Sequence, residues 1–298
     1  MRIVRSPRAL VFAALFFTAA AHAQNVDPYL RDIETKYIFG ITEGSGIGLE
    51  GEKEFSLETL SRMGKGGGSR YWASETKAEF EFTPNQYIQL EFGPFMSAHR
   101  IKDVPDFDNR NQFGLGGFFG EIRYQLLDRS QSQPLAVTLS AEPEWRRIDE
   151  TSGRVVDNYE LELKVNADVE LIPNRFYFGA NLLYEPEATH DPDRVGAGWQ
   201  KESKGGVSGA LSYRVLPQVF LGAEAWYLRH YDGSLFNTFT GDAVFVGPTL
   251  YVQLGPKMFM TAAWNVQVTG SEVDDPTAKL NLSEFSRQRA KLKVAIEF

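Results

Sequence analysis

Apolar and polar residues alternate along most of the chain between residues 50 and 298. The segment 157–171 shows this most clearly: apolar residues occupy every second position from 161, and the positions between them hold Glu160, Glu162, Lys164, Asn166, Asp168 and Glu170. Successive side chains of a strand point to opposite faces, whereas a helix would scatter these charges around its circumference. The pattern therefore predicts a strand with one apolar face and one charged face.

Twelve segments of this kind follow one another, separated alternately by long polar loops and by short turns. We expect strands at residues 50–61, 74–82, 86–95, 113–127, 135–147, 157–171, 176–185, 204–215, 219–228, 243–254, 258–268 and 286–298. At about 3.3 Å per residue, tilted strands of this length cross an apolar band of about 25 Å. A soluble β-sandwich would also alternate, but its outward face would be polar and its strands usually shorter. The long segments and the unequal connections favour a membrane barrel.

The last segment carries its basic residues on one face and ends the chain on an aromatic residue. It reads SRQRAKLKVAIEF, in which the basic face holds Arg287, Arg289, Lys291 and Lys293 and the final residue is Phe298. This ending resembles the closing strand of bacterial outer-membrane β-barrel proteins, which typically finish on phenylalanine after alternating apolar residues. The resemblance covers residues 50–298 as a general pattern rather than as a family-specific motif.

The resemblance implies an all-β fold: a transmembrane antiparallel up-and-down β-barrel of 12 strands with both ends of the barrel chain in the periplasm. It also implies a Gram-negative outer membrane, with its lipids and lipopolysaccharide as surroundings, and a barrel-assembly machinery that reads Phe298 as a signal. Twelve-stranded proteins of this class include channels for nucleosides and acidic sugars, and a phospholipase.

The first 23 residues have the composition of a secretory signal peptide. Three arginines precede an apolar run at residues 9–21, and Ala21-His22-Ala23 forms a small-residue cleavage site before Gln24. A retained anchor helix is the alternative, although the run is short for a membrane span. We expect residues 24–49 to form a periplasmic lead-in or a strap inside the lumen, and residues 50–298 to form the barrel.

Composition narrows the possible partners and the means of stabilisation. The net charge of −8 argues against a nucleic-acid partner. The chain has no cysteine, so an exported protein of this sequence must hold together without disulfides. A closed ring of backbone hydrogen bonds provides that alternative, and it also satisfies the backbone groups that lipid would leave without partners.

Closing such a barrel places the last strand beside the first. We therefore predict a closure seam in which acidic and basic side chains face one another, formed by Glu52, Glu54, Glu58, Arg287, Arg289, Lys291 and Lys293. Opposite charges across a strand pair contribute roughly 0.2–1 kcal/mol each. The same charges could instead select solutes, and the sequence leaves both roles open.

A second group of charges is expected to line the lumen about half-way round from the seam. Its members are Glu142, Glu144, Arg146, Glu160, Glu162, Lys164, Asp168 and Glu170. The inward-facing charges have a modest acidic excess, which would give a water-filled lumen a weak preference for cations.

Catalytic and metal sites are not expected. His99, His190 and His230 fall in predicted loops, so no serine–histidine pair can be placed on a barrel wall. The aspartates at 103, 106 and 108 match no calcium-loop spacing, and no cofactor is indicated. The sequence thus predicts a non-enzymatic channel for passive transport of small hydrophilic solutes. The alternative is a non-conducting structural or interaction barrel, plugged by residues 25–49 and acting through its loops.

Overall fold

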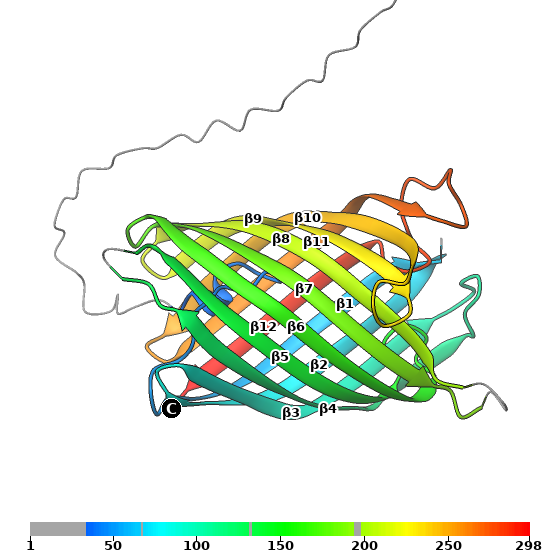
Figure 1. The fold of residues 1–298 in the computed structure, drawn as a ribbon, viewed down its shortest axis with the longest axis horizontal. Helices are drawn as coiled ribbons and strands as arrows, with labels where there is room; N and C mark the ends of the chain where they lie inside the picture. The colour runs from blue at the N-terminus through cyan, green and yellow to red at the C-terminus, as the bar shows by residue number, and fades with distance from the viewer. Residues whose placement is uncertain (1–33, 67, 131–132, 194–197) are drawn as a thin grey trace, which may run out of the picture. The chain divides into compact units, whose positions relative to one another are not determined.

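The protein is a closed β-barrel. The computed structural model describes residues 34–66, 68–130, 133–193 and 198–298; the predicted signal peptide and residues 24–33 lie outside these ranges. In the described residues, 12 antiparallel strands pair in chain order and β1 pairs with β12 to close the ring (Figure 1). The predicted fold class is therefore confirmed. The strands are β1 Lys53–Lys65, β2 Gly68–Asn85, β3 Ile88–Ile101, β4 Arg110–Leu127, β5 Leu135–Ile148, β6 Val155–Ile172, β7 Phe176–His190, β8 Gln200–Leu216, β9 Val219–Asp232, β10 Thr238–Gly255, β11 Met258–Glu272 and β12 Gln288–Glu297.

The strands place their apolar face outward and their polar face inward. On β6, Leu161 and Leu163 are exposed on the outer wall, whereas Glu160 and Asp168 are buried inside the barrel. A soluble sandwich would have the opposite arrangement. No helix among the described residues is both long and apolar enough to span a membrane. The outer wall thus presents an apolar surface of the kind that lipid requires.

The two ends of the barrel differ in their connections. We call the end that holds Phe298 and the β2–β3, β4–β5, β6–β7, β8–β9 and β10–β11 connections the turn end, and the opposite end the loop end. Glu54 near the start of β1 pairs with Glu297 near the end of β12, so the barrel chain begins and ends at the turn end. The assignment of that end to the periplasm stays a prediction.

The strands extend further toward the loop end than the sequence predicted. The expected loop at residues 96–112 shrinks to residues 102–109, and the expected loop at residues 62–73 is a tight connection between β1 and β2. Gly64 and Gly66 have positive φ angles of 70° and 58°, which suit this connection. The prediction failed there because apolar alternation marks only the part of a strand that faces lipid, whereas pairing with both neighbouring strands continues beyond it.

The closure seam differs in part from the predicted ladder. Glu52 precedes β1 and Arg287 precedes β12, so both were wrongly placed on strands. In the middle of the seam, Lys291 forms an ion pair with Glu58 at 2.9 Å. Lys293 lies 4.0 Å from Glu58 and 2.5 Å from Glu79 of β2.

The two remaining seam residues do not face opposite charges. Glu54 faces Glu297 across the seam, and Arg289 faces Arg62. Arg289 stacks instead over the ring of Phe245, with 4.1 Å between the guanidinium carbon and the ring centroid. The ion pairs of the seam are therefore concentrated at Lys291 and Lys293.

Reversing the charge of Lys291 tests this account of the seam. Lys291→Glu should lower the free energy of unfolding in lipid vesicles, because it sets a second carboxylate against Glu58. Adding Glu58→Lys should recover about 0.5–3 kcal/mol of that loss. Arg287→Glu is the matched control, since Arg287 is exposed just outside β12. Equal urea midpoints for Lys291→Glu and Arg287→Glu would contradict a stabilising role for this pair.

Candidate functional site in the barrel lumen

A short stretch of chain before β1 lies inside the barrel near the turn end. We call residues 34–48 the inner segment; it contains the 3-10 helix η1, Thr35–Tyr37 (Figure 1). Its apolar side chains are buried against inward-facing residues of the wall. Ile38 and Phe39 belong to one buried cluster with Tyr177, Phe220 and Phe259. The inner segment thus has an apolar anchor on strands β7, β9 and β11.

Wall carboxylates accept hydrogen bonds from the backbone of the inner segment. Asp168 accepts from the hydroxyl of Thr35 at 2.7 Å and from the backbone N–H of Ser45 at 2.6 Å. Glu224 accepts from the backbone N–H groups of Ile41 and Thr42 at 3.1 and 2.6 Å. A buried backbone donor must find a partner, so these two carboxylates supply what a strand neighbour would otherwise provide.

Charged side chains of the inner segment pair with the wall as well. Glu43 accepts from Arg123 at 2.7 Å and from Lys164 at 2.8 Å. Burial alone would raise the pKa of Glu43, but Lys164 and Arg123 outweigh it and hold that pKa well below its ordinary value of 4.5. The contribution of Glu43 to docking is therefore complete above pH 4.5, and it is lost only as the pH falls through the lowered pKa.

Lys36 is the corresponding cation of the inner segment. It forms ion pairs with Glu81 of β2, at 3.0 Å, and with Glu91 of β3. Burial opposes the charge of Lys36, but these two carboxylates prevail and raise its pKa well above the usual value. Both Lys36 and Glu43 thus remain charged at neutral pH and bind the inner segment to the wall.

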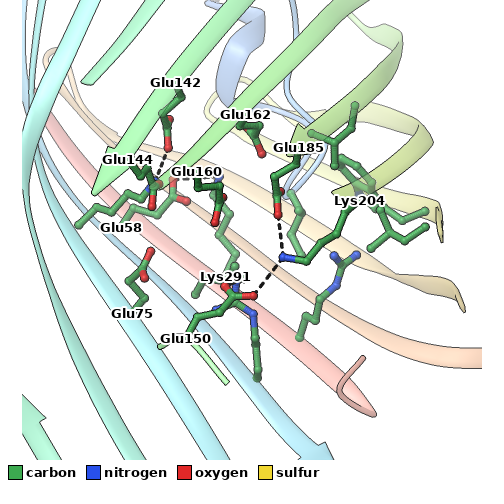
Figure 2. A pocket seen from close by; sticks show the side chains of 18 of the residues that line it. Glu58, Glu75, Glu142, Glu144, Glu150, Glu160, Glu162, Glu185, Lys204 and Lys291 are labelled. Atoms are coloured by element: carbon green, nitrogen blue, oxygen red, sulfur yellow. Dashed lines mark hydrogen bonds and ion pairs between the residues drawn. The ribbon is translucent and has the colours of Figure 1, made fainter. Parts of the chain in front are cut away.

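Beyond the inner segment lies a cavity of about 220 Å³ in the charged part of the lumen (Figure 2). Among the described residues, thirteen carboxylates and ten basic side chains line it. They are paired within and across strands: Arg146 contacts Glu144 of its own strand at 2.5 Å and Glu160 of β6 at 3.4 Å, and Lys204 of β8 contacts Glu185 of β7 at 2.7 Å. The cavity is therefore rich in charged groups, with a small acidic excess, and apolar side chains such as Trp226 and Phe245 line it as well.

Two loops contribute residues to the cavity from the loop end. In the β5–β6 connection, Glu150 forms ion pairs with Arg62 at 2.7 Å and with Lys204 at 3.3 Å. In the β11–β12 connection, Phe285 is buried in an apolar cluster that includes Trp226 and Phe245. The lumen thus has protein groups near both of its ends, with the cavity between them.

The predicted lumen residues lie in three different environments. Six of them line the cavity: Glu142, Glu144, Arg146, Glu160, Glu162 and Lys164. Asp168 instead holds the inner segment. Glu170 accepts hydrogen bonds from the backbone of Asn174 and, at 3.0 Å, from the hydroxyl of Tyr177, so it supports the turn after β6. Alternation identified the inward face correctly, but not how deep in the lumen each residue lies.

Sequence reasoning missed the residues that receive the inner segment. Arg123 and Glu224 lie on segments that were predicted as strands, at residues 113–127 and 219–228, but neither was singled out. Nothing in the local pattern indicated their partners, because the inner segment is distant in sequence and does not alternate. Glu43 was missed for the same reason.

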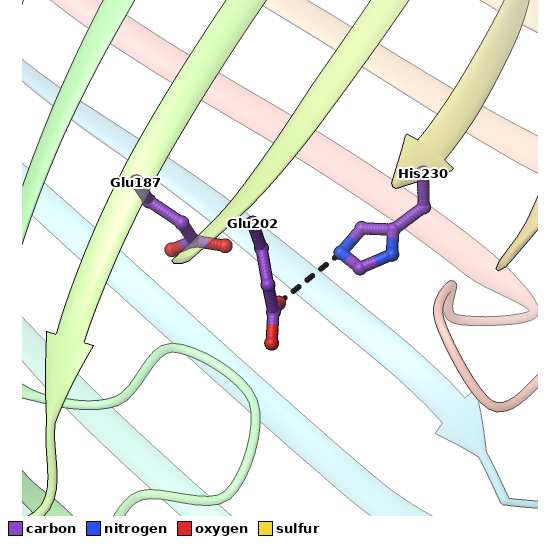
Figure 3. Close-up of side chains that lie close together, drawn as sticks. All are labelled: Glu187, Glu202 and His230. Atoms are coloured by element: carbon purple, nitrogen blue, oxygen red, sulfur yellow. Dashed lines mark hydrogen bonds and ion pairs between the residues drawn. The ribbon is translucent and has the colours of Figure 1, made fainter. Parts of the chain in front are cut away.

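The assignment of the histidines to loops was wrong. His99, His190 and His230 lie on strands β3, β7 and β9, because these strands extend beyond the predicted ends. His230 is buried and lies beside Glu202 of the neighbouring strand β8 and Glu187 of β7 (Figure 3). One imidazole and two carboxylates form a donor set that a transition metal can use.

Protein oxygens already face both nitrogens of the His230 ring. Nε2 lies 3.2 Å from the carboxylate of Glu202, and Nδ1 lies 2.8 Å from the hydroxyl of Thr240 and 3.4 Å from Glu284. These contacts give the ring a complete set of partners within the barrel. They explain its burial by hydrogen bonding and ion pairing alone.

Gly179 provides a direct test of how the inner segment docks. A Cβ atom at this position would lie 2.9 Å from the Phe39 ring, so Gly179→Val should displace that ring and loosen the inner segment. Trypsin should then cleave faster after Lys36, which is buried in the docked state. Gly209→Val is the matched control, because its Cβ would meet only the ring of Phe178, at an ordinary 3.5 Å. Equal protection of Lys36 in both variants would contradict the docking described here.

Comparison with solved structures identifies the fold class. An outer-membrane channel from Pseudomonas putida F1 superposes with a TM-score of 0.54 at 11% identity, over 85% of this chain and 97% of that one. The β domain of the Bordetella autotransporter BrkA gives a TM-score of 0.54 at 10% identity, over 84% of this chain and all of that domain, 100%. At such identities the likeness shows the fold alone. Together with the apolar outer wall, that fold places the protein in the outer membrane.

Sequence comparison adds a family. No curated protein matches the chain. The model of one family matches residues 32–298, which include the inner segment and the entire barrel. The chain therefore belongs to DUF6662, a family of unknown function.

Proposed function

We propose that the protein is a channel for passive transport of small hydrophilic solutes across the outer membrane, and that the inner segment closes its pathway in the conformation described. One observation carries the proposal: a cavity lined by charged side chains lies inside a closed barrel, directly beyond a segment that is not part of the barrel wall. Polar and charged linings are the surfaces along which hydrated solutes and ions move.

The inner segment is suited to act as a gate because the wall does not depend on it. The ring of strands closes through the pairing of β1 with β12, without a strand from residues 34–48. The segment docks through side-chain contacts such as those of Asp168 and Glu224, which can be exchanged for water when it leaves. Its release would open the turn end of the lumen while the backbone hydrogen bonds of the barrel stay intact.

The lining of the cavity favours a weak preference for cations. Thirteen carboxylates against ten basic side chains leave a net acidic excess, and removal of the inner segment takes away one of each, Glu43 and Lys36. A modest excess of one sign attracts counter-ions without excluding the other sign. The proposal includes no enzymatic activity, since His230 is fully engaged by its neighbours.

The proposal also names partners at the outer surface of the barrel. Outer-membrane lipids and lipopolysaccharide would surround the apolar wall, and the barrel-assembly machinery would bind the C-terminus. Phe298 is exposed at the turn end, and its backbone N–H donates to Lys53 of β1 at 2.9 Å. A terminal aromatic that stays accessible in the closed barrel is consistent with a recognition signal. Removal of residues 1–23 as a signal peptide remains part of the same proposal.

The second candidate function is a non-conducting barrel that acts through its loops. The specific observation in its favour is the internal pairing of the lumen charges, exemplified by Lys77 with Glu142 and Glu144. Paired side chains that stay in place would fill the pathway. The two functions differ in whether the lumen conducts once the inner segment is gone.

Deleting the inner segment decides between them. Without residues 34–48, the refolded barrel should show a larger single-channel conductance in a planar bilayer than the full chain. Heat-modifiable migration on gels confirms that the barrel has folded. A folded deletion variant that remains silent would overturn the channel function and favour the interaction barrel. Conductance equal to that of a conducting full chain would instead reject the gate.

Ion selectivity tests the role of the cavity charges separately. In the deletion variant, Glu160→Gln together with Glu162→Gln should shift the reversal potential in a salt gradient toward anions, because two of the three excess carboxylates are lost. Glu170→Gln is the matched control, since Glu170 supports a turn and does not line the cavity. A reversal potential that is the same in both variants would refute selection by these residues.

A further inference from the structure

Three carboxylates meet where the inner segment contacts the first hairpin of the wall. They belong to Glu34 of the inner segment, Glu54 of β1 and Glu81 of β2. One oxygen from each lies within 4.8 Å of the others. Like charges at this separation repel, and the repulsion grows as water is removed. The arrangement therefore requires something that compensates it.

Hydrogen bonding within the protein leaves part of this cluster without partners. Glu54 is only 1% exposed, yet its Oε2 accepts no hydrogen bond, and Oε1 of Glu34 is also buried without a partner. The hydroxyl of Tyr37 lies 3.0 Å from Glu54 and 2.8 Å from Glu81. A hydroxyl has one hydrogen and can donate fully to only one of the two carboxylates.

Nearby cations compensate only one of the three carboxylates, Glu81, which pairs with Lys36. Lys36 is shared between Glu81 and Glu91, and Lys293 is engaged by Glu79 and Glu58. Glu34 and Glu54 thus have no basic partner of their own among the described residues. A buried carboxylate without compensation is strongly unfavourable, so it must bind either a proton or a metal cation.

We propose that Glu34, Glu54 and Glu81 bind a hard divalent cation of the Ca²⁺ class, which fastens the inner segment to the barrel wall. The unpartnered oxygens Oε1 of Glu34 and Oε2 of Glu54 provide ligand positions, and their carboxylates come from both the segment and the wall. All donors are oxygens, which favours Ca²⁺ over Zn²⁺. Ca²⁺ also tolerates an irregular set of ligands, whereas Mg²⁺ requires nearly ideal octahedral geometry.

The cation would act as a latch, in the sense that it would hold the inner segment against strands β1 and β2. Without it, protonation is the remaining way to relieve the cluster, and burial together with Glu81 and Glu54 already raises the pKa of Glu34 well above its usual value. Binding of the cation replaces that proton with two positive charges shared by three carboxylates. Binding itself does not depend on conduction; only the consequence for gating rests on the proposed channel function.

The binding experiment uses the full chain, refolded in detergent free of lipopolysaccharide and stripped with EDTA. Calorimetric titration with CaCl₂ should show one site per chain, and Ca²⁺ should raise the melting temperature. Glu34→Gln with Glu54→Gln should weaken binding by at least about tenfold, because two of three carboxylate ligands are lost. Glu187→Gln is the matched control, as it lies in the other carboxylate cluster, beside His230, and should bind Ca²⁺ like the wild type.

A spectroscopic readout locates the ion independently of stability. Tb³⁺ in the site should give sensitised emission from Tyr37, which Tyr37→Phe reduces while the Ca²⁺-dependent rise in melting temperature is kept. Absence of Ca²⁺ binding to the wild type, or equal binding by the Glu34→Gln/Glu54→Gln variant, would overturn the site. A melting temperature that responds to pH but not to Ca²⁺ would show that protons alone compensate the cluster, which also overturns it.

Measurements of conductance test the Ca²⁺ latch and the proposed channel function separately. The full chain should open more often in EDTA than in CaCl₂, and the Glu34→Gln/Glu54→Gln variant should not respond to Ca²⁺. If the chain lacking residues 34–48 conducts but the full chain ignores Ca²⁺, the latch is wrong and the channel function stands. If Ca²⁺ binds but the barrel never conducts after the deletion, the site stands and the channel function fails.

Discussion

The need to hydrogen-bond every backbone group in lipid determines the rest of this structure. A β-sheet meets that need only when its first and last strands pair, as β1 and β12 do here. Once the ring closes, each strand has one face toward lipid and one toward the lumen, so the polar half of the sequence is forced inside. The many charges of the interior are therefore a consequence of the solvent outside, and they must be compensated within a narrow space.

The charged side chains inside the lumen are compensated in two ways. Around the cavity, carboxylates and basic side chains of different strands pair with one another, as Arg146 of β5 does with Glu75 of β2 and Glu160 of β6. Near the turn end, wall carboxylates bind backbone N–H groups instead, and the inner segment supplies them. Asp168 and Glu224 thus form a receptor for a chain segment that has no strand neighbour of its own. The side chains of this segment add contacts of their own, since the Ser45 hydroxyl donates to Asp168 at 2.7 Å and Ile41 packs against the cluster that holds Phe285.

Whether a structural feature could be predicted from the sequence depends on how far apart in the chain the interacting residues lie. Strand number, closure and the inward position of Glu160, Glu162 and Lys164 follow from alternation, which is local. The ends of the strands and the placement of His99 and His230 do not, because lipid contact stops before strand pairing does. The role of Asp168 could not be predicted, since its partners Thr35 and Ser45 lie more than 100 residues away in the chain. The compensation of buried charge is the non-local part of the fold.

The same distinction limits what the fold can say about function. A channel and an autotransporter domain share this barrel architecture at comparable TM-scores, so the ring of strands is compatible with more than one use. What distinguishes this chain is the content of its lumen. At the loop end, Phe285 is held by an apolar cluster and Glu150 by ion pairs with Arg62 and Lys204. At the turn end, the inner segment is held both by the apolar anchor of Ile38 and Phe39 and by wall carboxylates. Under the proposed function, the inner segment is the part of the lumen that would leave, because it is not a strand of the ring.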